Sequence, residues 1–144
     1  MSVKIATDSA ADLPFNVIRD YNVIVYPLLV YLDGEEYLDS VNLLPDALYD
    51  RMREGAQVKT AQIPMAYFIE TFEHYAKNGD DVIYLAFSSG LSGTYQTAVM
   101  AYQTVQEMYP SFHMTIVDTK CVSLGLGLIV LEASQMASQG ATRD

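Results

Sequence analysis

Short hydrophobic runs alternate with amphipathic stretches along most of the chain. Strands are predicted over residues 3–9, 81–89 and 113–120, and the second is a continuous apolar run of the kind buried on both faces of a parallel sheet. Apolar residues at helical spacing predict helices over 12–22, 44–55, 65–79, 92–110 and 123–140. Because strands and helices alternate from about Asp80 onward, we expect an α/β fold with a mostly parallel sheet and helices on both faces.

The segment before the second helix has a different character. Residues 23–40 are rich in β-forming residues, and Asp33-Gly34 predicts a hairpin turn between two strands. The stretch 57–64, which reads QVKTAQIP, is interpreted as a loop. Asp12 is expected to cap the first helix, with Pro14 in its first turn.

Composition and charge narrow the class of protein. The chain contains 51% hydrophobic and 18% charged residues, so we expect residues 1–144 to form one globular domain. A net charge of −10 repels phosphate backbones and anionic membrane surfaces, so we expect no nucleic-acid partner. No apolar run approaches the roughly 20 residues of a spanning helix, so no stable membrane insertion is expected. The single Cys121 and the acidic start of the chain favour a cytoplasmic location.

Polar turns follow three of the predicted strands and read TDSAADL, SSGLSGT and DTKCVSLG. In an open α/β sheet the carboxyl ends of the strands face the ligand crevice. In the second turn Ser92 stands at the expected N-cap of a helix, where free N–H groups favour a carboxylate or a phosphate. Capping alone would explain the same residues, so the turn by itself leaves both interpretations open.

The residues needed for catalysis are poorly arranged. GLSGT has Thr94 where the hydrolase motif G-x-S-x-G requires its second glycine. Neither His74 nor His113 is predicted to lie where it could act as a base for Ser92. A phosphate-loop motif is missing, and the acids at the strand ends match no pattern of metal ligands. We therefore assign no catalytic residue and no metal ligand.

Four segments, taken in order, resemble the DegV family of bacterial fatty-acid-binding proteins: ATDSAADLP, KTAQIP, FSSGLSGTYQTA and DTKCVSLGLGLIV. The resemblance implies that residues 1–144 are the α/β N-terminal domain of the family, and that the family's C-terminal domain is absent from this chain. It implies a long-chain fatty acid as the ligand, with its carboxylate near the junction of the two domains. It also implies a partner, because members of the family can present the fatty acid to a kinase subunit that makes the acyl phosphate.

The resemblance also assigns a site, residue by residue. Thr60 falls on the family threonine that hydrogen-bonds the carboxylate, and Ser92 falls on its serine partner. The family loop usually reads T-S-Q-P, whereas Ala61 and Ile63 replace the serine and the proline here. The complete set of predicted ligand-binding residues is Thr60, Gln62, Ser89, Ser92 and Gly93.

The leading hypothesis is therefore a non-catalytic fatty-acid carrier without a cofactor. One alternative is a phosphate-ester or nucleotide-handling α/β enzyme that uses the same helix N-terminus. Another is an interaction domain without a ligand. Because a second domain would cover apolar surface, we expect the chain alone to form a homodimer or to show an exposed apolar patch.

Overall fold

The computed structural model describes residues 3–143, which fold around a parallel sheet. The strand order is β2-β1-β6-β7, and each neighbouring pair is parallel. The strands are β1 (Lys4–Asp8), β2 (Ile24–Tyr26), β6 (Val82–Ala86) and β7 (Met114–Asp118). Strands and helices alternate around this sheet, so the predicted α/β class is confirmed.

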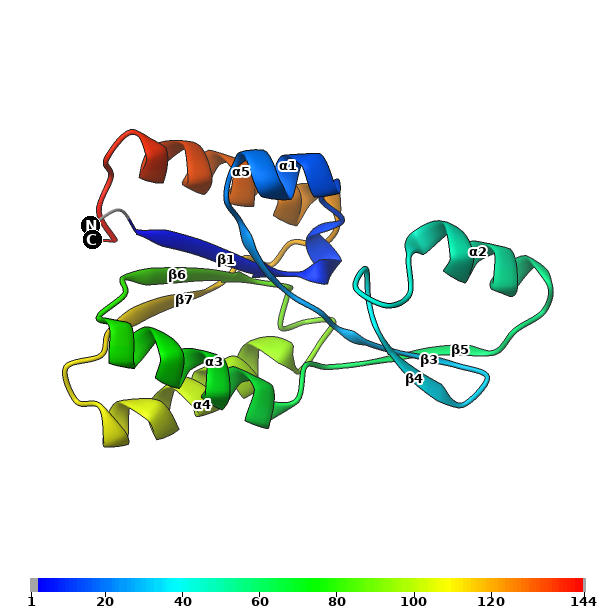
Figure 1. The fold of residues 1–144 in the computed structure, drawn as a ribbon, viewed down its shortest axis with the longest axis horizontal. Helices are drawn as coiled ribbons and strands as arrows, with labels where there is room; N and C mark the ends of the chain where they lie inside the picture. The colour runs from blue at the N-terminus through cyan, green and yellow to red at the C-terminus, as the bar shows by residue number, and fades with distance from the viewer. Residues whose placement is uncertain (1–2, 144) are drawn as a thin grey trace.

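Helices cover both faces of the parallel sheet, as Figure 1 shows. On one face lie α3 (Met65–Asn78) and α4 (Thr94–Met108), and on the other lie α1 (Phe15–Asp20) and α5 (Leu124–Ser138). Successive side chains of a strand point to opposite faces, so each face has its own core. Tyr84 packs towards α3 beside Phe68, whereas Leu85 belongs to the core under α5. None of these helices, nor any other among residues 3–143, is long and apolar enough to span a membrane.

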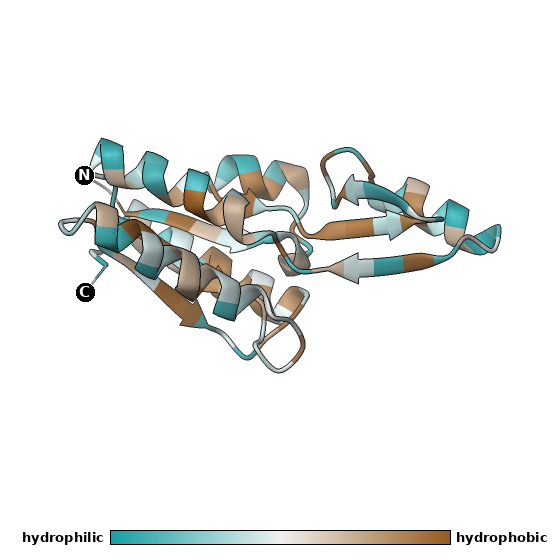
Figure 2. Cartoon of the chain, turned by 90° about the horizontal axis from the view of Figure 1, so that it is seen from below, coloured by the Kyte–Doolittle hydropathy of each residue, from teal (hydrophilic) through white to brown (hydrophobic). Residues whose placement is uncertain are grey.

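A small antiparallel sheet extends the molecule beyond the carboxyl ends of the parallel strands (Figure 1). Its strand order is β4-β3-β5, and Leu48 of α2 (Pro45–Arg53) packs against its core. We call this sheet and α2 the extension; its strands are β3 (Leu29–Leu32), β4 (Glu35–Leu38) and β5 (Val58–Ala61). The predicted turn at Asp33-Gly34 joins β3 to β4, and both of its residues have positive φ. Figure 2 shows brown, hydrophobic residues along parts of the strands and a mixture of brown and teal residues on the helices.

Two details of the sequence-based prediction are wrong. Residues 58–61 form β5 instead of a loop, because β3 offers a pairing edge, with Val30 opposite Thr60 in the register. Asp12 does not cap α1, whose N-cap is Pro14 without a side-chain hydrogen bond. Asp12 instead ends the short 3-10 helix η1 (Ser9–Ala11) in the left-handed conformation, which aspartate tolerates better than most residues.

Glycine at position 127 allows α5 to pack directly against η1. A Cβ atom added at Gly127 would lie 2.9 Å from the carbonyl oxygen of Ala11 and 3.0 Å from a methyl carbon of Leu13. Backbone atoms cannot move aside as a flexible side chain can. The close approach of α5 to the end of β1 therefore requires a glycine here.

Candidate functional site

The three polar turns meet at the carboxyl ends of β1, β6 and β7. The N–H of Phe87 donates to Asp8 Oδ2 at 2.8 Å, and the N–H of Ser88 donates to the Cys121 carbonyl at 3.1 Å. A further backbone bond of 2.8 Å runs from the N–H of Ser123 to the turn after β1. The three turns therefore form one hydrogen-bonded edge of the sheet, on the side where ligands bind in open α/β folds.

Asp8 is fully buried within this edge, with an exposed fraction of 0%. Its Oδ2 accepts hydrogen bonds from the Tyr84 hydroxyl at 2.9 Å and the Phe87 N–H at 2.8 Å, and its Oδ1 accepts from the Ala10 N–H at 3.2 Å. Burial raises the pKa of the Asp8 carboxyl, although the hydrogen bonds work in the opposite direction. Asp8 thus fastens the end of β1 to the turn that follows β6.

The turn after β6, residues 88–93, is called the elbow below. It folds back because the N–H groups of Leu91 and Ser92 both donate to the Ser88 carbonyl, at 3.0 and 3.1 Å. The Ser92 hydroxyl accepts from the Thr94 N–H at 3.1 Å and donates to the Thr94 hydroxyl at 2.9 Å. The N-cap of α4 is Gly93, so the expected cap position is one residue off. The Ser92 oxygen still satisfies one of the free N–H groups of the first turn.

The elbow and the end of β5 together line a pocket of about 230 Å³. Four of the five predicted ligand-binding residues lie on its wall: Thr60 from β5, Gln62 just after β5, and Ser92 and Gly93 from the elbow. The remaining lining residues are Leu28, Ala61, Phe87 and Leu91. The pocket thus combines hydroxyl and amide groups with apolar walls, and it lies between the end of β5 and the segment that follows β6.

Within this pocket the Gln62 carboxamide lies directly against Gly93. A Cβ atom at position 93 would overlap Gln62 Oε1 and would lie 3.2 Å from Gln62 Cδ. Gly93 has a φ of −75°, which any residue can adopt. The glycine is therefore required by the space that Gln62 occupies and not by the conformation of the backbone.

The fifth predicted residue, Ser89, is not among the residues that line this pocket. Its hydroxyl donates to Asp118 Oδ2 at 2.5 Å and accepts from Lys120 Nζ at 2.7 Å, and its N–H donates to Asp118 Oδ1 at 3.1 Å. The hydrogen bonds from Lys120 and Ser89 hold the pKa of the Asp118 carboxyl below its usual range. Direct contact between Ser89 and a ligand stays a prediction.

A larger hollow, of about 560 Å³, lies between the extension and the start of α1. Sequence analysis did not find it, because its residues come from segments far apart in the chain. The one sequence signal for a wall of this hollow is the amphipathic spacing of Pro45, Leu48 and Tyr49. Thr60 lines this hollow as well as the smaller pocket, and two carboxylates, Asp12 and Asp39, stand on its wall.

Large apolar side chains are exposed around the elbow. Leu91 is 68% exposed, and Leu124 and Leu128, which lie one turn apart on α5, are 69% and 68% exposed. Val122, in the turn after β7, is 44% exposed. Exposed apolar side chains therefore occur at this end of the fold, whereas a continuous apolar patch and dimerisation stay predictions.

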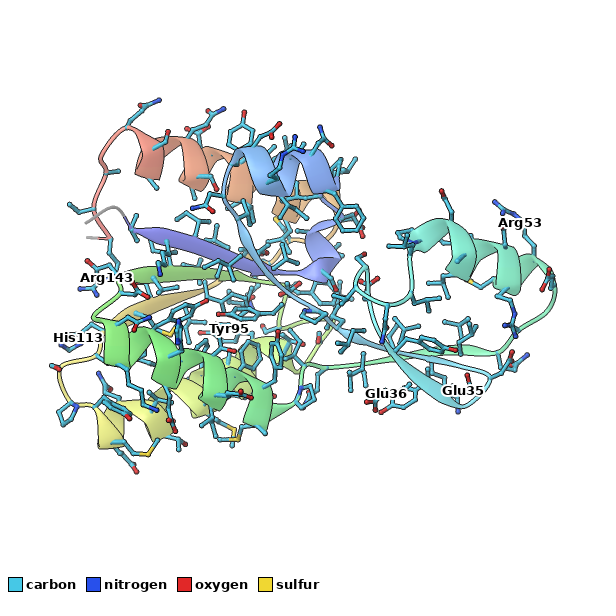
Figure 3. The ribbon with its side chains drawn as sticks, viewed as in Figure 1. Glu35, Glu36, Arg53, Tyr95, His113 and Arg143 are labelled. Carbon is cyan, nitrogen blue, oxygen red and sulfur yellow. The ribbon has the colours of Figure 1, made fainter. Side chains whose placement is uncertain are left out.

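Both histidines lie away from the elbow in this arrangement. Figure 3 labels His113 beside Arg143 at the end of the sheet opposite the extension, and its carbonyl accepts a hydrogen bond from Arg143 at 3.0 Å. His74 contacts Asn78 on the exposed side of α3, at 3.0 Å. Across residues 3–143, no three His, Cys, Asp or Glu residues gather as a group able to hold a metal ion.

These features define an α/β domain with a candidate pocket at the carboxyl ends of its parallel strands, lined by neutral hydrogen-bonding groups. Comparison with known sequences identifies the family to which the chain belongs. The sequence profile described as "Uncharacterised protein, DegV family" matches residues 2–144, and this chain belongs to that family. The predicted resemblance is therefore confirmed.

The chain is similar to a DegV domain-containing protein of Clostridium perfringens (strain 13 / Type A), with 42% identity over 142 residues. That match covers 97% of this chain and 49% of the relative, so the chain spans about half of the relative's length. A stearic-acid-binding protein from Eubacterium ventriosum ATCC 27560 has a similar structure, with a TM-score of 0.91 and 28% identity over 97% of this chain and 49% of that one. A DegV family protein from Thermus thermophilus, described by its fatty acid binding, aligns with a TM-score of 0.84 and 34% identity over 99% of this chain and 49% of that one.

Proposed function

We propose that this chain binds a long-chain fatty acid and holds its carboxylate between Thr60 and Ser92. The observation that carries the proposal is that these two hydroxyls, one from strand β5 and one from the elbow, line one pocket beside the N-terminus of α4. The positive end of a helix dipole favours an anion at this position. The likeness to the stearic-acid-binding protein of Eubacterium ventriosum supports a fatty acid as that anion.

Most of the binding free energy in this proposal comes from the acyl chain. At about 0.8 kcal/mol per buried CH₂ group, a chain of roughly 16 carbons contributes about 12 kcal/mol before ordering costs are subtracted. The carboxylate then needs orientation more than attraction. Two hydroxyls and the Gln62 amide can supply this orientation without a fixed cation.

The acyl chain in this proposal leaves the pocket along the exposed apolar side chains of the elbow and α5. The large exposed fractions of Leu91, Leu124 and Leu128 mean that contact with a lipid would remove much apolar surface from water. The larger hollow suits a lipid tail less well, because burying the carboxylates of Asp12 and Asp39 beside it would cost free energy. This chain buries one side of the tail in this proposal, and the half of the relatives that lies outside the match would bury the other side as well.

The bound carboxylate is presented to a partner in this proposal. A carboxylate is ionised at neutral pH, so it can attack a phosphoryl group without a base from this chain. The partner is a fatty-acid kinase subunit that transfers the phosphoryl group from a nucleoside triphosphate to the carboxylate. This chain is then a non-catalytic carrier in this proposal, because the phosphoryl transfer takes place on the partner.

Native mass spectrometry of the purified chain tests the proposal directly. The chain is incubated with palmitate, and the bound molecule is identified after organic extraction. We expect one palmitate per chain and a weaker complex with hexadecanol, because the alcohol keeps the acyl chain but lacks the charged group that the pocket orients. Stabilisation by inorganic phosphate or a nucleotide, with no palmitate complex, would instead support the phosphate-handling enzyme.

Replacement of Gly93 by alanine is expected to weaken palmitate binding about tenfold, because the new Cβ atom displaces Gln62 from the pocket wall. The free energy of unfolding should change by less than about 1 kcal/mol, since Gln62 can move towards solvent. Isothermal titration and urea denaturation measure the two quantities. Gly90→Ala is the matched control, because a Cβ atom there would meet only Ser88 Oγ, at an ordinary 3.5 Å. Equal affinities in the two variants would contradict the assignment of Gln62 to the site.

A further inference from the structure

Three side chains outside the pocket fasten the elbow to the turn after β7. Lys120 Nζ donates to Ser89 Oγ at 2.7 Å and pairs with Asp118 Oδ2 at 2.5 Å. The same carboxylate oxygen accepts the Ser89 hydroxyl at 2.5 Å. Asp118 Oδ1 accepts the N–H of Ser89 at 3.1 Å. We call these three residues the Ser89 cluster.

The path from this cluster to Ser92 is short and continuous. Ser88 and Ser89 both bond through their N–H groups to the turn after β7, at the Cys121 carbonyl and at Asp118. The Ser88 carbonyl then accepts the N–H of Ser92 at 3.1 Å. Any rotation of the backbone at Ser88 and Ser89 would therefore move Ser92 relative to the pocket.

The location of the cluster indicates a local role and not a contribution to global stability. The side chain of Lys120 is 68% exposed and that of Asp118 is 14% exposed, so solvent reaches the ion pair from the lysine side and weakens its contribution to the free energy of unfolding. Lys120 also has a φ of 55°, a left-handed conformation that a lysine adopts only when its surroundings enforce it. The opposite charges of Asp118 and Lys120 cancel, so the cluster does not attract an anion by net charge.

We propose that Asp118 and Lys120 are positioning residues, which hold Ser89 and thereby fix the elbow in the conformation that carries Ser92 and Gly93 to the carboxylate. This inference rests on the proposed function and extends it to residues that line no part of the pocket. Ser89 acts here through the elbow backbone, not through the ligand. A preorganised site loses less conformational entropy on binding, so loosening the elbow weakens the recognition of a carboxylate.

The test compares Asp118→Asn and Lys120→Met with the wild-type chain. Glu73→Gln is the matched control, because Glu73 forms an exposed ion pair of 2.8 Å with Lys77 on α3. Amide hydrogen exchange reports the mobility of the elbow, and titration with palmitate reports the carboxylate site. In both test variants we expect exchange at Leu91 and Ser92 to accelerate about tenfold and palmitate affinity to fall about five- to tenfold. The melting temperature should match that of Glu73→Gln, and Lys120→Arg should restore the affinity.

A double substitution distinguishes a role in positioning Ser92 from a general loosening of the fold. If Asp118 acts through Ser92, then Asp118→Asn should lower palmitate affinity no further in a chain that already carries Ser92→Ala. Additive losses would overturn the inference, as would wild-type exchange rates at the elbow in Asp118→Asn. If the wild-type chain binds palmitate and Asp118→Asn binds it equally well, this inference fails and the proposed function stands. If the wild-type chain does not bind palmitate, the proposed function fails and this inference fails with it.

Discussion

A chain that carries both Thr60→Val and Ser92→Ala is expected to bind palmitate about a hundredfold more weakly than the wild type. Each substitution removes one hydrogen bond to a charged group, which is worth about 1.5–3 kcal/mol, and about 1.4 kcal/mol corresponds to a tenfold change in affinity. The fold should survive. Valine suits strand β5, and the loss of the Ser92 bond to the Thr94 N–H costs about 1 kcal/mol, as for other helix caps. Isothermal titration with palmitate measures the effect.

Two controls make this result specific to the site. Thr115→Val changes a threonine on β7, and Ser138→Ala changes an exposed serine on α5; neither residue lines the pocket. The chain with both control substitutions should keep wild-type affinity. If the Thr60 and Ser92 variant bound palmitate as tightly as this control, the carboxylate would have to lie elsewhere.

Replacement of Asp8 by alanine is expected to lower the free energy of unfolding by about 3–5 kcal/mol. The change leaves the Tyr84 hydroxyl and the N–H groups of Phe87 and Ala10 without their acceptor, and an unpaired buried donor costs about 1–3 kcal/mol. Urea denaturation followed by circular dichroism measures the loss. Asp20→Ala, at an exposed aspartate on α1, should change the same quantity by less than about 0.5 kcal/mol. An equally small loss in Asp8→Ala would contradict the proposed fastening of β1 to the end of β6 and to Phe87.

The raised pKa of Asp8 also predicts a pH dependence with a definite sign. Between the ordinary pKa of 3.8 and the higher pKa in the folded chain, the folded state binds a proton that the unfolded state does not. Stability therefore rises as the pH falls through this window. The lowered pKa of Asp118 has the opposite effect, because that contribution is lost as the pH falls.

A comparison with Asp8→Asn isolates the Asp8 contribution, because Asp118 titrates in both proteins. We expect the wild type to gain stability relative to Asp8→Asn as the pH falls from neutral towards 3.8. Denaturation at a series of pH values measures this difference. A difference that stays constant, or that shrinks towards acid, would show that burial does not control the protonation of Asp8.

Local patterns were sufficient to predict most of the fold from the sequence. The continuous apolar run of β6 and the helical spacing in α3 each depend on neighbouring residues, and so does the turn at Asp33-Gly34. The family resemblance then pointed to Thr60 and Ser92, which the structure brings to one pocket. The start of α1 was misjudged because Asp12 and Pro14 are both plausible first residues by local rules, whereas in the structure Asp12 ends η1, which packs against α5 at Gly127, and Pro14 is the N-cap.

What the sequence by itself determined is therefore the set of elements and the polar turns that follow the strands. Only the tertiary structure decided which polar residues share a site. Residues 58–61 carry no strand pattern of their own and become β5 through their pairing with β3, which is what brings Thr60 to the elbow. Ser89 and Ser92 stand three positions apart in one polar run, yet Asp118 and Lys120 engage the first while the second lines the pocket. The physical reason is that a hydroxyl bonds to whatever the fold places beside it, and those neighbours come from distant parts of the chain.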